Sequence, residues 1–185
     1  MTQETQEVVA SYITDMLALE EHLQKAFAGQ LADLKDSPYA STLRDLTSTS
    51  EAHARALHAL AERREQGGQG IAEVVKKAAS SVLGMGAAAL DFVRSEKTPK
   101  NLRDDYAAVS LANVGYLMLH TTAMTLHDAE AASLAHAHLR DYAKASMTLF
   151  HLIPGSVVDF LKDEGFPIDD TVTAKLDAST KDVWR

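Results

Sequence analysis

The sequence predicts an all-α protein whose core is a four-helix bundle. Four long segments carry apolar residues at steps of three and four, which is the spacing of one helical face. Proline occurs at only four positions, where it separates segments because it lacks an amide donor and clashes with the preceding helical turn. No window alternates apolar and polar residues with β-branched side chains, the pattern typical of a strand.

The first two long helices are predicted over residues 4–34 and 39–65. An Asp-Ser-Pro sequence at residues 36–38 ends the first helix. The glycine-rich residues 67–70 end the second, because glycine accepts the left-handed conformation of a helix cap. The two apolar stripes are Val9, Ile13, Met16, Leu23, Phe27 and Leu31 in the first helix and Leu43, Leu46, Leu57 and Leu60 in the second.

The other two long helices are predicted over residues 102–127 and 128–152. Before them, residues 71–95 predict two shorter helices divided at residues 84–86, and residues 98–101 predict a break. We expect residues 153–155, around Pro154, to end the fourth long helix. A short helix over residues 156–162, a turn at residues 165–167 and a last helix follow; Asp170 or Thr171 caps this helix, which runs toward Trp184.

These segments predict a single domain over residues 1–185. The core bundle spans about residues 4–153 and is followed by a C-terminal helical extension over about residues 154–185. A long helical crossover, about residues 67–99, joins the second and third long helices. Because that connection is long enough to travel the length of the bundle, we expect these two helices to lie parallel.

Composition excludes several classes of function. The chain of 185 residues has no cysteine, which excludes disulfides, thiol catalysis and thiolate zinc sites. Its net charge of −8 argues against nucleic acid as a partner, because phosphates attract cations. No segment predicts a membrane span or a signal peptide, so we expect a cytoplasmic protein. Phosphate-binding glycine motifs and HExxH are also absent.

Polar residues interrupt every apolar stripe. Burying a charge or an imidazole is costly unless the group is paired or binds a metal. Such residues can therefore form a metal site, although an inward histidine more often bonds to a protein neighbour. The interrupting residues are Glu20 on the first helix, Ser50 and His53 on the second, Asn113, Tyr116 and His120 on the third, and His138 and Asp141 on the fourth.

The glutamate pattern of a di-iron centre is missing. A carboxylate-bridged pair of irons in a bundle needs a Glu on two helices and Glu-x-x-His on the other two. No histidine of this chain has a glutamate three residues before it. In addition, no glutamate lies between Glu96 and Glu130 or between Glu130 and Glu164, which covers both later long helices.

Three local sequences nevertheless resemble a known family. Residues 13–23 (ITDMLALEEHL), residues 50–60 with His53 and Leu57-His-Ala-Leu60, and the helix start Leu102-Arg103-Asp104 are similar to helices of the ferritin-like superfamily. More narrowly, they resemble the bacterial stress-associated proteins of YciE/YciF type. The resemblance spans about residues 8–152 and implies a ferritin-like fold with two metal ions that react with oxygen or peroxide.

Carried over residue by residue, the resemblance supports the ferritin-like fold but weakens the expectation of di-metal chemistry. Only Glu20 matches a metal glutamate, and His53 falls near a second-helix ligand. Residues 114–118 stand where the family's third-helix ligands are expected, and residues 140–142 stand in place of the fourth-helix carboxylates. The resemblance therefore implies a degenerate di-metal site.

Three functions follow as expectations. The first is a non-catalytic, stress-associated ferritin-like bundle without a cofactor, which binds a small apolar ligand, a protein partner or a second copy as a homo-oligomer, a dimer above all. Its recognition surfaces would be residues 67–99 and the tail after Pro154. The second is a metalloprotein with one iron or zinc, oxidase-like or for storage. A toxin–antitoxin or secretion-linked interaction domain is a third. The metal ligands of the second are Glu20, His53, His120, His138 and Asp141.

Overall fold

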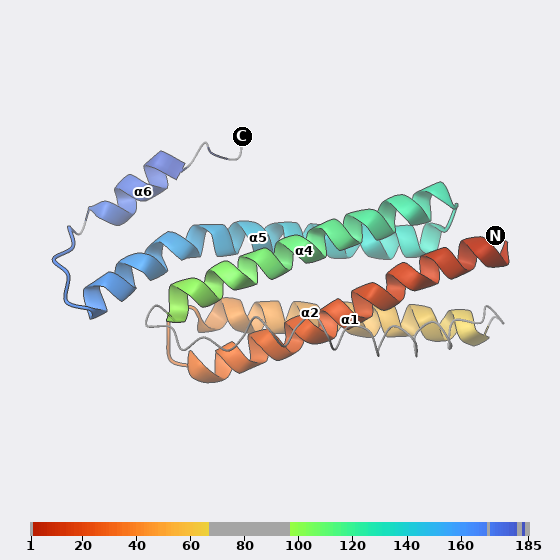
Figure 1. The fold of residues 1–185 in the computed structure, drawn as a ribbon, viewed down its shortest axis with the longest axis horizontal. Coiled ribbons are helices and arrows are strands. Elements are labelled where there is room, and N and C mark those ends of the chain that lie inside the picture. Colours follow the sequence, from red (N-terminus) through yellow and green to blue (C-terminus); the bar gives the residue numbers. More distant parts are fainter. Residues whose placement is uncertain (1, 67–96, 170, 181–182, 184–185) are drawn as a thin grey trace.

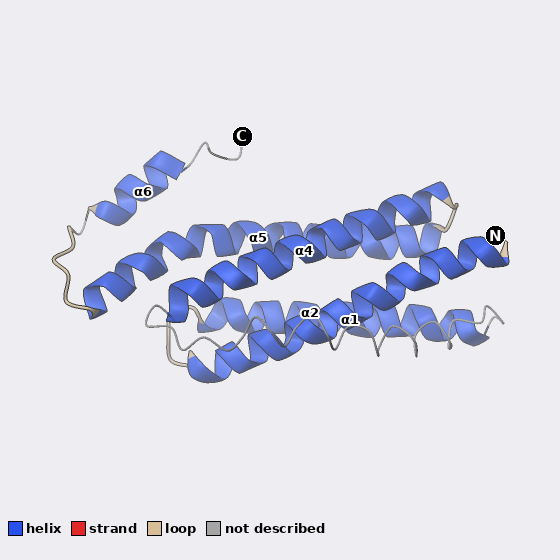
Figure 2. Cartoon of the chain, viewed as in Figure 1, coloured by secondary structure: helices blue, strands red, loops and turns tan. Residues whose placement is uncertain are grey.

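A computed structural model describes residues 2–66, 97–169, 171–180 and 183 of the chain. Every regular element in these residues is a helix, which confirms the predicted all-α class (Figure 2). The elements are α1 (Gln3–Asp33), α2 (Ala40–Gln66), α4 (Lys97–Thr125), α5 (Ala129–Asp163) and α6 (Val172–Thr180). The helices predicted within residues 71–95, and the crossover that contains them, lie outside the described residues, as does Trp184.

The four long helices form two antiparallel hairpins. α1 packs against α2, and α4 packs against α5 (Figure 1). The hairpins join because α1 also contacts α4 and α2 also contacts α5. α2 and α4 run in the same direction, as the predicted long connection between them requires (Figure 1).

Polar side chains fix where several helices begin. Thr2 caps α1 by accepting a hydrogen bond from the amide of Thr5 at 3.3 Å. Asp128 caps α5 by accepting from the amide of Ala131 at 3.1 Å. These bonds satisfy amides that have no partner within the first turn of a helix. His127, the residue directly before this cap, has a φ of 58°, so the turn from α4 to α5 uses the left-handed region.

The apolar stripes predicted from the sequence form the core, except that Leu31 at the end of the first stripe is only partly buried. Leu43, Leu57 and Leu60 of α2 are fully buried, and Leu46 is nearly so. On the other helices the largest fully buried side chains are Ile13, Leu23, Phe27, Leu102, Tyr116, Leu119, Tyr142 and Leu149. The core therefore draws on all four long helices.

Two predicted helix boundaries are wrong, and both concern proline. Pro99 lies in the first turn of α4, where amides have no helical acceptor and a proline costs nothing. Pro154 lies inside α5, which continues to Asp163. Ser156 and Val158 are buried beyond Pro154, so packing in the last two turns compensates for the missing hydrogen bond. The predicted short helix over residues 156–162 is thus the end of α5.

The C-terminal part after α5 is confirmed as a turn and a short helix. Just before α6, Asp169 accepts a hydrogen bond from the amide of Thr171 at 2.9 Å. Asp170, one of the two predicted caps, lies outside the described residues. α6 contacts α5 (Figure 1). No described helix is long and apolar enough to cross a membrane.

Candidate functional site

Glu20 lies at the centre of the bundle with no exposed surface. Four polar side chains from the other three long helices contact its carboxylate. Ser50 Oγ lies 2.7 Å from Oε2, and His53 Nδ1 lies 3.1 Å from Oε1, both from α2. Tyr116 of α4 donates to Oε1, and Tyr142 of α5 donates to Oε2. Each oxygen of this carboxylate therefore has two protein partners.

The two tyrosines are held in their protonated form. Burial raises the pKa of the Tyr116 hydroxyl far above its ordinary value, and the negative charge of Glu20 raises it further. The same two causes, in the same order, raise the pKa of Tyr142. Both side chains are fully buried. They remain hydrogen-bond donors to Glu20 across the physiological range of pH.

His53 bridges Glu20 to the surface of the bundle. Its Nδ1 faces Glu20, and its Nε2 lies 3.3 Å from Oδ2 of Asp141. Each ring nitrogen therefore faces a carboxylate oxygen, and the buried ring of His53 lies between two carboxylates. Asp141 is the outer one, with 51% of its side chain exposed.

His138 stacks on His53 and stays neutral. The ring centroids lie 3.8 Å apart with an angle of 15° between the planes. Burial lowers the pKa of His138 to about 3, and the charge of His53 adds to that effect. Nδ1 of His138 is buried and has no hydrogen-bond partner within the described part of the chain.

The structure brings together four of the five residues predicted as metal ligands, namely Glu20, His53, His138 and Asp141. It gives the fifth, His120, other partners. Nδ1 of His120 lies 2.9 Å from the carbonyl oxygen of Ala132, and its ring lies 5.3 Å from that of His136. The sequence therefore located the centre of the network and placed one residue too many in it.

The residues of this network do not fit a metal ion as they are arranged. Both oxygens of Glu20 already accept from protein donors, so an ion would displace at least one hydroxyl. A zinc ion bound to an imidazole nitrogen lies in the ring plane about 2 Å away. One ion cannot lie in both planes of two parallel rings stacked 3.8 Å apart. Among the described residues, no three His, Asp or Glu side chains form a metal-holding group.

Sequence reasoning missed the role of the two tyrosines. Tyr116 lies on the predicted inward stripe of α4. Tyr142 follows His138 by four residues, so His138 and Tyr142 lie on one face of α5. A buried carboxylate needs several donors. Donors on the inward stripes, rather than further metal ligands, were therefore the signal that identifies both tyrosines.

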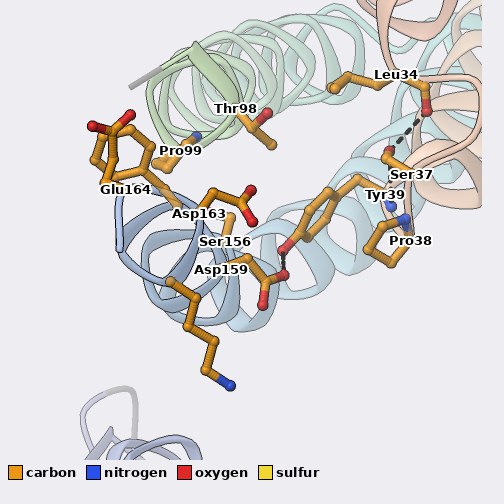
Figure 3. A pocket seen from close by; sticks show the side chains of 12 residues that line it. Leu34, Ser37, Pro38, Tyr39, Thr98, Pro99, Ser156, Asp159, Asp163 and Glu164 are labelled. Carbon is orange, nitrogen blue, oxygen red and sulfur yellow. Dashed lines mark hydrogen bonds between the residues drawn. The ribbon is translucent and has the colours of Figure 1, made fainter. Parts of the chain in front are cut away.

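Surface grooves between the described helices include one that reaches the network. A groove of about 220 Å³ between α2 and α5 is lined by Asp45, Thr49, Asp141 and Lys144 among others, and so reaches the outer end of the network. A larger cleft of about 580 Å³ lies at the end of the bundle where the turn between α1 and α2 meets the start of α4 and the end of α5 (Figure 3). There the hydroxyl of Tyr39 donates to Asp159 at 2.6 Å, and Ser37 donates to the carbonyl oxygen of Leu34 at 2.7 Å (Figure 3).

The chain shares its fold with a solved structure. A crystal structure of a protein from Xanthomonas campestris pv. campestris superposes with a TM-score of 0.63, over 88% of this chain and 99% of that chain. The two sequences are 16% identical, so the likeness shows the fold alone. No family model matches the chain, and no curated protein matches its sequence significantly.

Proposed function

We propose that this protein is a non-catalytic helical bundle of ferritin-like ancestry that works by binding a protein partner, and that a side-chain network has replaced a di-iron centre. One observation carries the proposal. The central carboxylate, Glu20, accepts hydrogen bonds on both oxygens from side chains of α2, α4 and α5. A carboxylate used in this way is a structural acceptor rather than a metal ligand.

The network has a structural task that suits a binding protein. A buried carboxylate without partners would cost several kcal/mol, and its partners here come from each of the other long helices. A polar group that is satisfied in only one arrangement favours that arrangement over alternatives of similar packing. The network therefore fixes how the two hairpins meet, and it keeps the outer surface of the bundle in one shape.

The biological setting of the proposal comes from the resemblance alone. The YciE/YciF-type proteins, which residues 8–152 resemble, are associated with stress in bacteria, and we place this protein in the same kind of process. A cytoplasmic location belongs to the proposal as well, because a chain without cysteine depends on no oxidising compartment.

A second candidate function is a protein with one iron or zinc ion. The buried and unpartnered Nδ1 of His138 favours it, because a metal would satisfy that atom. His53 stacks on His138 and contacts both Glu20 and Asp141. This candidate requires the stacked histidine rings to separate and Glu20 to release a hydroxyl donor.

Elemental analysis separates the two functions. We expect protein purified from medium supplemented with iron and zinc to contain far less than one ion per chain, and we expect no rise in melting temperature when iron(II) or zinc is added. Glu20→Gln and His53→Ala are tested in parallel, with His22→Ala as the control, because His22 is an exposed histidine of α1. A stoichiometric ion that both variants lose and the control keeps would establish the metalloprotein instead.

A further inference from the structure

The outer side of α4 is apolar although it faces away from the core of this chain. Half or nearly half of each large side chain there is exposed: Leu111 by 59%, Val114 by 54%, Leu117 by 50%, Met118 by 47% and Met124 by 60%. The opposite side of the same helix is buried in the bundle through Val109, Ala112, Tyr116, Leu119 and Ala123. α4 therefore has two apolar faces, and its contacts with α1 and α5 account for one of them.

This outer face carries no charge. No Asp, Glu, Lys or Arg occurs between Asp105 and Asp128, and the part of this stretch that belongs to α4 is about 30 Å of helix. The chain as a whole has a net charge of −8. An acidic protein that keeps one helix face uncharged over this length provides a place where two copies can meet without repulsion.

The spacing on this face is that of a helix-pairing seam. Ala107, Leu111, Val114, Met118, Thr121 and Thr125 follow one another at steps of four and three. Such a seam packs against a second helix in the geometry of a coiled coil. The set is symmetric about residue 116, so an antiparallel copy of α4 presents the same residues in the reverse order.

Antiparallel pairing also places the side chain of Leu111 opposite a surface groove of the second copy. A groove of about 400 Å³ lies between the start of α1 and the end of α4, and Val8, Thr121, Thr122 and Thr125 are among its lining residues. In the symmetric register, Leu111 of a second copy lies opposite Thr121 and enters this groove. The two-fold axis repeats the contact at the other end.

The charges at the two ends of the seam are complementary in the same register. Arg103 stands one turn before Ala107; it is exposed and pairs with the exposed Asp104 of its own chain at 2.6 Å, so a second partner would share it. Glu4 lines the groove at the other end. Arg103 of the second copy therefore lies next to Glu4, and this pairing occurs twice in the symmetric dimer.

We infer that the outer face of α4 is the interface of an antiparallel homodimer. This inference deepens the proposed binding function, because it names a second copy of the chain as the partner. The two proposals fail separately, since metal content tests the first and the state of association tests the second. A monomeric protein would remove the dimer and leave a different protein as the partner.

Light scattering coupled to size exclusion, with sedimentation as a second method, tests the dimer. We expect the full chain, of 20.0 kDa, to have twice that mass in solution. Leu111→Glu places a charge in the groove and raises the dissociation constant by about 10-fold or more. Met147→Glu is the matched control, because Met147 is 42% exposed and lies on α5, outside the seam. Circular dichroism verifies that both variants keep their helices.

Cysteine cross-linking tests the register, and a chain without cysteine is suited to it. We expect a mixture of Leu111→Cys and Thr121→Cys to form a disulfide on oxidation, and neither variant to do so alone. In the antiparallel register the two Leu111 positions are about 15 Å apart along the helix, which is too far for a disulfide. A monomeric wild-type chain, a dimer that Leu111→Glu leaves intact, or a Leu111→Cys dimer formed alone would each overturn the inference.

Discussion

Glu20 is a carboxylate with no exposed surface, and its burial carries a large cost in free energy. Burying a charge in a protein interior costs several kcal/mol after relaxation, and the cost is recovered only if every lone pair finds a donor. Here Ser50, His53, Tyr116 and Tyr142 supply the donors. Removing any one of them leaves the charge in place and takes away part of its compensation.

We therefore expect Tyr116→Phe and Tyr142→Phe to lower the free energy of unfolding by about 1.5–3 kcal/mol each, the usual worth of a hydrogen bond to a charged group. Urea titration with circular dichroism measures the loss. Tyr106→Phe is the control, because Tyr106 is only half-buried and lies outside the network. If both network variants were as stable as this control, Glu20 would not depend on the two hydroxyls.

At the scale of whole helices, the sequence predicted most of the fold and failed at proline. The stripes on α1 and α2 are periodic and long, so their inward faces followed directly, including Glu20, Ser50 and His53. The helix boundaries predicted at Pro99 and Pro154 were wrong because local propensity indicates where a helix is weak. It does not indicate whether tertiary packing stabilises the helix there. The two tyrosine donors were missed for a related reason, since their role depends on contacts between helices that are remote in sequence.

Gly115 shows how closely α4 approaches α1. A Cβ atom added there would lie 2.6 Å from Sδ of Met16, a side chain that is only 3% exposed. Gly29 of α1, by contrast, has open space around it. Both are interior helix positions, where alanine is intrinsically better than glycine by about 0.5–1 kcal/mol.

We expect Gly29→Ala to raise the free energy of unfolding by about 0.5–1 kcal/mol, and Gly115→Ala to lower it by about 1–2 kcal/mol because Met16 has to move. Chemical denaturation of both variants measures the difference. In a Met16→Ala background the collision is absent, so Gly115→Ala should then stabilise α4 as Gly29→Ala stabilises α1. Destabilisation that persists in that background would show that another contact is responsible.

For the molecule as a whole, two buried titratable groups outside the Glu20 carboxylate make stability depend on pH in opposite directions. Burial raises the pKa of Asp105 to about 7, and neighbouring Asp104 adds to the effect while Gln30, which donates to Asp105 at 2.7 Å, opposes it. Burial lowers the pKa of His138 to about 3. The folded protein therefore holds an extra proton at Asp105, and lacks one at His138, relative to the unfolded chain.

The contribution of Asp105 is fully present below pH 4 and is lost as pH rises toward 7. That of His138 is present above pH 6.5 and is lost as pH falls toward 3. Between about pH 4 and 6.5 the two slopes oppose each other, each at most about 1.4 kcal/mol per pH unit. Single variants should separate them in urea titrations from pH 4 to 8.

Relative to wild type, we expect Asp105→Asn to become progressively more stable as pH rises from 4 to 7, because the variant has no carboxyl to ionise. Its amide can also donate to Oε1 of Gln30, which lacks a partner in the described structure. His138→Phe should show the opposite trend and gain on wild type as pH falls below 6.5, since phenylalanine keeps the stacking on His53 and cannot take up a proton. Differences from wild type that stay constant across this range would mean that neither group has a shifted pKa in the folded protein.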